Sequence, residues 1–124
     1  MEERHKKITS YKDLEIWKKG VRLSIEIYRI TEQFPKSELF GITNQLRRSG
    51  ASIPANIAEG YGRESTKSYR QFLKTARGSL NETETFLYIS HGLNYLDKEK
   101  LSVLLNRTTE LSKMITSLLS KLNS

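Results

Sequence analysis

Four basic side chains with a helical spacing are the clearest candidates for binding chemistry: Lys67, Arg70, Lys74 and Arg77. Residues three, four and seven positions apart share one face of an α-helix, so the four are expected to form one stripe. Lysine and arginine neutralise phosphate groups without reading base sequence, which suits a nucleic-acid backbone. Arg63 adds a positive charge just before the stripe. The alternative is that the stripe is only a solvated helix face.

The charge of the whole chain favours a polyanionic partner. The formal net charge is +7 and the pI is about 9.7. Residues 41–80 hold seven basic and two acidic side chains, a local charge of +5. A basic excess is typical of nucleic-acid-binding proteins, although many basic proteins bind other partners. Residues 1–10 are predicted to be a flexible basic tail, in which Arg4, Lys6 and Lys7 either extend the binding surface or only aid solubility.

Catalytic and metal-binding patterns are missing from the sequence. The two histidines, His5 and His91, stand apart, and there is no HExxH motif, Walker-type loop or glycine-rich phosphate cradle. No cysteine is present, which excludes disulfides and thiolate metal sites and fits the reducing cytosol. No apolar run approaches the roughly 20 residues that a membrane span needs. We therefore expect a cytoplasmic protein without enzymatic activity, cofactor, metal or membrane contact.

Apolar periodicity predicts four helices that account for nearly the whole chain. They cover residues 13–33, 38–61, 66–95 and 98–122, with Asp13 and Asp97 as N-caps of the first and last. The connections are only a few residues long, so consecutive helices should be antiparallel. The predicted fold is an all-α, antiparallel up-down-up-down four-helix bundle, formed by a single domain over residues 11–124.

The first predicted helix is apolar on two sides. One seam contains Trp17 and Tyr28, and the opposite seam contains Leu23, Ile27 and Ile30. A single bundle core needs only one stripe of about 100° or more. The second seam therefore either thickens the core of one chain or packs against another subunit. We predict that Leu23 and Ile27 lie between the subunits of a cyclic homo-oligomer.

Pro54 stands inside the second predicted helix among residues with very small side chains. We expect it to bend this helix, and Gly50, Ala51, Ala55 and Ala58 to form a close helix–helix contact. The alternative is that Pro54 starts a new helix after a break at residues 49–50.

A polar seam runs along the same predicted helix, opposite its leucines and isoleucines. It contains Arg48, Ser52, Asn56 and Glu59. An Arg48–Glu59 pair or a network through Asn56 is expected to fix the register of the helices or subunits, as buried polar groups sometimes do. The alternative is that these groups line a ligand pocket.

Three ordered segments resemble a known family: YKDLEIWKKGVRL, LRRSGASIPANIAEGYGR and FLKTARGSLNETETFL. Over about residues 10–120 the chain is similar to the four-helix-bundle proteins encoded within intervening sequences of bacterial 23S rRNA genes. The resemblance implies an antiparallel four-helix bundle and a homopentamer, as in close relatives. A related branch, the accessory variability proteins of diversity-generating retroelements, is basic and binds nucleic acid and a reverse transcriptase.

Two functions follow from the charge and the resemblance. The first is an oligomeric protein that binds RNA or DNA largely without sequence specificity. The second is an interaction scaffold that docks a reverse transcriptase or a ribosomal component and has no direct role in nucleic-acid binding.

Overall fold

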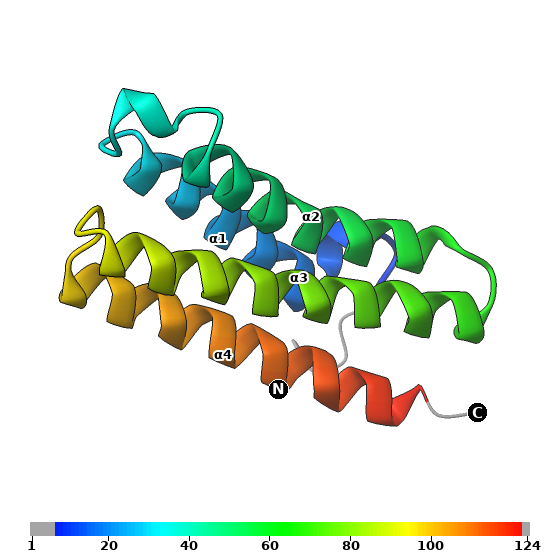
Figure 1. Cartoon of the computed structure of the whole chain (residues 1–124). Coiled ribbons are helices and arrows are strands. Elements are labelled where there is room, and N and C mark those ends of the chain that lie inside the picture. Colours follow the sequence, from blue (N-terminus) through cyan, green and yellow to red (C-terminus); the bar gives the residue numbers. More distant parts are fainter. Residues whose placement is uncertain (1–6, 123–124) are drawn as a thin grey trace.

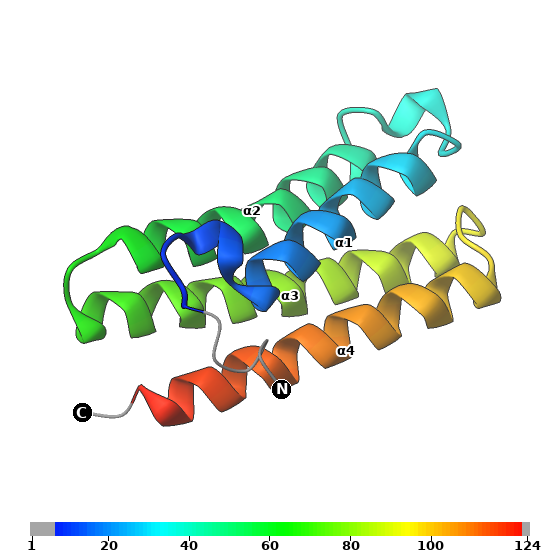
Figure 2. The same cartoon turned by 180° about the vertical axis from the view of Figure 1, so that it is seen from behind.

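The computed structural model describes residues 7–122, which form four α-helices and two short 3-10 turns. The helices are α1 (Glu15–Thr31), α2 (Ile42–Gly62), α3 (Thr66–Gly92) and α4 (Lys98–Lys121), and the turns are η2 (Tyr11–Asp13) and η3 (Lys36–Glu38). Successive helices run antiparallel (Figures 1 and 2). No strand occurs within residues 7–122. The predicted all-α four-helix bundle is confirmed.

The starts of the helices follow ordinary capping chemistry, with one difference at the first. The Ser65 hydroxyl accepts a hydrogen bond from the backbone N–H of Ser68, and the Asp97 carboxylate accepts one from Lys100. Asp13 does not cap α1. Its carboxylate instead accepts the backbone N–H of Ser10, which stabilises η2. The chain therefore makes this short turn before α1 begins at Glu15.

The core contains the seam of α1 that we expected between subunits. Leu23 is 1% exposed and Ile27 is 0% exposed, and Ile30 packs against the same core. The opposite seam is the one that faces solvent, since Ile25 and Tyr28 are each 45% exposed. The prediction that Leu23 and Ile27 form a subunit interface is therefore wrong. Spacing alone reveals two apolar seams, but it does not tell which of them meets the other three helices.

Pro54 lies within α2 and is buried, which excludes a break before it. It faces Gly20 of α1, where a Cβ atom would come 3.3 Å from the Pro54 Cβ. Further along, Gly50 packs against the Ile27 side chain. The close contact of α2 with α1 thus uses the proline and two glycines. Ala55 is exposed, so its predicted place in that contact is wrong.

The packing of α2 against α3 is equally close at one point. A Cβ on Gly60 would lie 2.6 Å from the Phe72 Cβ and 3.3 Å from the backbone oxygen of Tyr69. These atoms belong to or adjoin the backbone of α3, so they move only if the helix moves. Gly60 is therefore required by the separation of α2 and α3.

We expect Gly60→Ala to destabilise the fold by about 1–2 kcal/mol, because overpacking outweighs the gain of about 1 kcal/mol in helix propensity. Gly78 of α3 is the matched control, since it is exposed and a Cβ there has nothing within 4 Å. Gly78→Ala should stabilise by up to about 1 kcal/mol. Urea unfolding of both variants measures the two changes, and a stabilising Gly60→Ala contradicts the close contact.

Candidate nucleic-acid interface

Three of the exposed lysines that the structure describes lie in the first half of α3 and the second half of α4. Lys67 and Lys74 belong to α3, and Lys113 belongs to α4. None of them takes part in an ion pair within residues 7–122. Since α3 and α4 run antiparallel side by side, this face joins residues that are far apart in the sequence (Figure 1). The three ammonium groups remain available to an external anion.

The two arginines of the predicted stripe have partners on α4. Arg70 donates hydrogen bonds from Nη1 to the backbone oxygens of Leu119 and Leu122, the latter at 3.2 Å. Such carbonyls at a helix C-terminus lack intrahelical partners, and a cation there is favourable. Arg77 donates to the Thr116 hydroxyl at 3.1 Å. The stripe is thus divided into outward lysines and arginines that join α3 to α4.

Arg63 also has a partner within the chain. Its Nη2 lies 2.8 Å from a Glu59 carboxylate oxygen, and its guanidinium lies 4.9 Å from the centre of the Phe72 ring. Glu59 therefore forms its ion pair with Arg63, four residues later, and the predicted Arg48–Glu59 pair is wrong. Both side chains of the pair are about half exposed, so the pair contributes little to stability.

The predicted polar seam of α2 does not join helices through its charged residues. Arg48 is exposed, and Asn56 donates to the Ser52 backbone oxygen at 2.7 Å, within its own helix. Arg48 and Ser52 border a small polar hollow of about 200 Å³ between α2 and α3. Among the residues of the seam that the structure describes, Arg48 and Ser52 line this hollow, and it is the feature that corresponds to the predicted ligand pocket.

Hydroxyl groups make the polar contact between α2 and α3 instead. Ser52 donates to Ser79 at 2.6 Å, and Thr83 donates to Ser49 at 2.9 Å. Ser49 and Thr83 are buried, so these bonds satisfy groups that are costly to leave unpaired. The sequence carried a signal for this network, because both helices place small hydroxyl residues one turn apart.

A shallow groove of about 490 Å³ runs between α3 and α4 beside Lys113. Its lining is largely hydroxyl and amide side chains, and its two charged groups are the Lys113 ammonium and the Glu84 carboxylate. The lining residues include Asn81, Thr109, Ser112, Thr116 and Ser117. Such groups commonly contact phosphate oxygens. This lining was not predicted from the sequence, although Thr109, Ser112 and Thr116 follow one another at helical spacing.

Two tyrosines near the turn between α2 and α3 are used in packing. The Tyr61 and Tyr69 rings meet edge to face with 6.0 Å between their centres. Burial, and secondarily the neighbouring Tyr61, raise the pKa of Tyr69 above its usual value. The Tyr69 hydroxyl therefore stays protonated at neutral pH and adds no negative charge to the basic face.

Residues 12–117 match the family model of the 23S rRNA-intervening sequence proteins. The chain belongs to this family. The crystal structure of a protein of unknown function from the S23 ribosomal protein family of Bacteroides thetaiotaomicron is similar, with a TM-score of 0.76. The two chains are 27% identical, and the match covers 84% of this chain and 97% of the other. No curated protein shows significant similarity.

Two further predictions concern membrane spans and the basic tail. None of the helices that the structure describes is long and apolar enough to span a membrane. Arg4 and Lys6 of the predicted tail lie outside the described residues.

Alanine substitutions of Arg70 and Lys74 should distinguish a residue that stabilises the fold from one that is free to bind a partner. Arg70→Ala leaves carbonyls at the end of α4 without their donor, and we expect a loss of about 1–2 kcal/mol in unfolding free energy. Lys74→Ala removes an exposed, unpaired side chain and should change stability by less than about 0.5 kcal/mol. Urea unfolding measures both, and equal effects of the two substitutions would contradict the division of the stripe.

Proposed function

We propose that this protein is an oligomer that binds RNA or DNA largely without sequence specificity, encoded in a 23S rRNA intervening sequence or a similar context. The observation that carries the proposal is that Lys67 and Lys74 of α3 and Lys113 of α4 are exposed and form no ion pair within residues 7–122, and that Lys113 borders a groove lined largely by hydroxyl groups. Ammonium and hydroxyl groups suit phosphates, and this chemistry does not distinguish bases.

Self-association is part of the proposal because one copy offers few phosphate contacts. Three free lysines on this face of a single chain give weak binding at physiological salt. Several copies in a closed ring present the same face repeatedly to one long strand, and the contacts then reinforce one another. The homopentamer of close relatives is the assembly that we propose.

The solvent-facing seam of α1 is the surface that we assign to this assembly. Ile25 and Tyr28 are each 45% exposed, and Val21 and Trp17 are half-buried on the same side. The Arg47 guanidinium lies 4.7 Å from the centre of the Tyr28 ring and donates to the Tyr28 backbone oxygen, which fixes one edge of the seam. An exposed apolar seam of this kind is typical of an interface.

We expect Ile25→Asp to dissociate the oligomer and leave the helices folded, because the side chain is half in solvent. Leu23→Asp should instead unfold the chain, since it places a charge in the core. Multi-angle light scattering at micromolar concentration, together with circular dichroism, distinguishes the two. A monomeric wild-type protein would remove self-association from the proposal.

The alternative function is an interaction scaffold that docks a reverse transcriptase or a ribosomal component. The observation that favours it is the set of exposed apolar side chains near the turns that join α1 to α2 and α3 to α4. These are Leu39, Phe40, Tyr88, Ile89 and Leu93. We expect no enzymatic activity, cofactor requirement or membrane association in either case, and a cytoplasmic location.

Charge reversal on the basic face tests the nucleic-acid proposal. Lys67→Glu/Lys74→Glu should weaken binding to a fluorescent single-stranded oligonucleotide at least tenfold in 0.1 M salt and flatten the salt dependence. The control Lys18→Glu/Lys98→Glu changes the net charge equally, near the N-termini of α1 and α4, and gives up only an exposed ion pair of Lys18 with Glu15, which contributes little to stability. Fluorescence anisotropy over a salt series measures both.

The control should bind almost as the wild type does. If both double variants lose affinity equally, only the net charge matters and the α3–α4 face is not a site. If the wild-type protein binds no oligonucleotide even at low salt, the scaffold alternative replaces the proposal.

A further inference from the structure

The groove between α3 and α4 contains one carboxylate, Glu84, among groups that suit phosphate. Apart from Glu84 and Lys113, every side chain that lines it carries a hydroxyl or an amide. Its volume of about 490 Å³ lies within the usual range of small-ligand sites. A carboxylate repels phosphate groups. Glu84 is therefore unfavourable in a phosphate-binding groove unless the same ligand also donates a hydrogen bond to it.

Glu84 is held in place by a buried hydroxyl of α4. The Thr108 hydroxyl donates to Glu84 Oε2 at 2.5 Å, and Thr108 is 0% exposed. Glu84 itself is half-buried. A carboxylate accepts hydrogen bonds through both oxygens, and Oε1 has neither a donor nor a cation as partner within residues 7–122. Glu84 thus offers a ligand a fixed acceptor that the chain does not use.

Donors for phosphate lie towards the other end of the groove. Arg77 donates from Nη1 to the Thr116 hydroxyl at 3.1 Å, and that hydroxyl donates to no group in the part of the chain that the structure describes. A hydroxyl that accepts from a guanidinium is itself a stronger donor. Arg77 and Glu84 are seven residues apart on α3, about 10 Å along the helix. The Thr116 hydroxyl and the Lys113 ammonium can therefore bind phosphate while Glu84 contacts a neighbouring group of the same strand.

The group that best matches the unused acceptor is a ribose 2′-hydroxyl. When the phosphates of a strand lie along a groove, the sugars are the groups next to them. The 2′-hydroxyl is a hydrogen-bond donor, and it distinguishes RNA from DNA. Carboxylates also accept ribose hydroxyls in dinucleotide-binding folds. A base amino group could donate as well, but not every base has one, so such a contact would read sequence.

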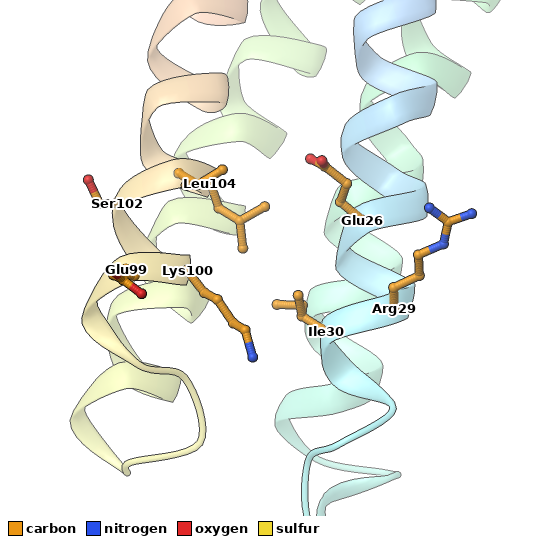
Figure 3. Close-up of a pocket in the computed structure, with 8 residues that line it drawn as sticks. Glu26, Arg29, Ile30, Glu99, Lys100, Ser102 and Leu104 are labelled. Carbon is orange, nitrogen blue, oxygen red and sulfur yellow. The ribbon is translucent and has the colours of Figure 1, made fainter.

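The larger groove between α1 and α4, of about 690 Å³, does not have this chemistry. Ile30 and Leu104 point into the space between the two helices, whereas Ser102 points away from it (Figure 3). The Glu26 carboxylate of this groove already forms an ion pair with Arg107, at 2.8 Å. The α1–α4 groove therefore offers a strand mainly apolar contacts, and we assign the strand to the α3–α4 groove only.

We propose that Glu84 accepts a hydrogen bond from a ribose 2′-hydroxyl while the neighbouring phosphates contact Lys113 and Thr116, so that the protein prefers RNA to DNA. This inference rests on the proposed nucleic-acid binding by the α3–α4 face, and it names the substrate class of that site. In RNA the hydrogen bond offsets the repulsion between Glu84 and the phosphates. In DNA the repulsion has no such compensation.

Three fluorescent oligonucleotides test the wild-type protein: RNA, DNA and 2′-O-methyl RNA of one sequence that contains only A and C. This sequence avoids the difference between uracil and thymine, so the probes differ only at the 2′ position. The 2′-O-methyl group keeps an RNA-like sugar but cannot donate a hydrogen bond. Fluorescence anisotropy at one fixed salt concentration should show RNA bound roughly fivefold or more tightly than either other probe.

Glu84→Ala should remove most of this preference. We expect weaker binding of RNA and unchanged or tighter binding of DNA, because the variant loses both the acceptor and the repulsion. The fold should persist, since the Leu105 backbone oxygen lies 3.0 Å from the Thr108 hydroxyl as another acceptor, and circular dichroism checks this. Glu82→Ala is the matched control, because Glu82 is exposed on the same helix and does not line this groove. It should change the binding of RNA and DNA alike.

The results separate this inference from the proposed function. A wild-type protein that binds none of the probes overturns both. Equal binding of RNA and DNA overturns only the inference. A preference for RNA that Glu84→Ala leaves intact, as Glu82→Ala does, also overturns it. The same holds if 2′-O-methyl RNA binds as tightly as RNA, since sugar shape then explains the preference without a donor.

Discussion

The arrangement of this protein depends on how closely α2 approaches its two neighbours. Helix α2 carries a proline, whose ring needs space and whose nitrogen cannot donate a hydrogen bond. Gly20 of α1 provides that space next to Pro54, and Gly60 lets α3 approach on the other side. Hydroxyl pairs between Ser49 and Thr83, and between Ser52 and Ser79, occupy the same narrow contact. A Cβ atom at Gly60 would collide with α3, and one at Gly50 with Ile27, so the segment that is richest in small residues is architectural.

This constraint decides which surfaces are left for partners. With α2 held against α1 and α3, one seam of α1 enters the core and the other faces solvent. Arg70 and Arg77 extend from α3 to α4, and that contact leaves the nearby lysines free. The basic face and the exposed apolar seam are therefore consequences of the packing, and they involve different helices. The two proposed roles, phosphate binding and self-association, therefore fall on separate surfaces.

Periodicity and capping residues predicted the four helices and their antiparallel order, because these depend on local sequence. The roles of Leu23 and Ile27 were mistaken, since a helix with two apolar seams fits the core in either rotation until its neighbours are known. Arg70 was predicted to bind nucleic acid, but it donates hydrogen bonds to backbone carbonyls at the end of α4. Carbonyl partners of this kind cannot be recognised from the sequence, because every residue has one. The hydroxyl lining contributed by α4 was overlooked because serine and threonine are common on any solvated helix.

Hydrogen–deuterium exchange of the intact protein, with and without a single-stranded oligonucleotide, tests the two central claims most directly. These claims are that the small-residue segment of α2 is architectural and that the α3–α4 face is the binding site. The account predicts slower exchange on binding over residues 66–81 and 109–121. Residues 46–58 should exchange slowly in both states, because buried and closely packed backbone is already protected. Protection that appears on binding in residues 46–58, with none in α3 and α4, would contradict the account.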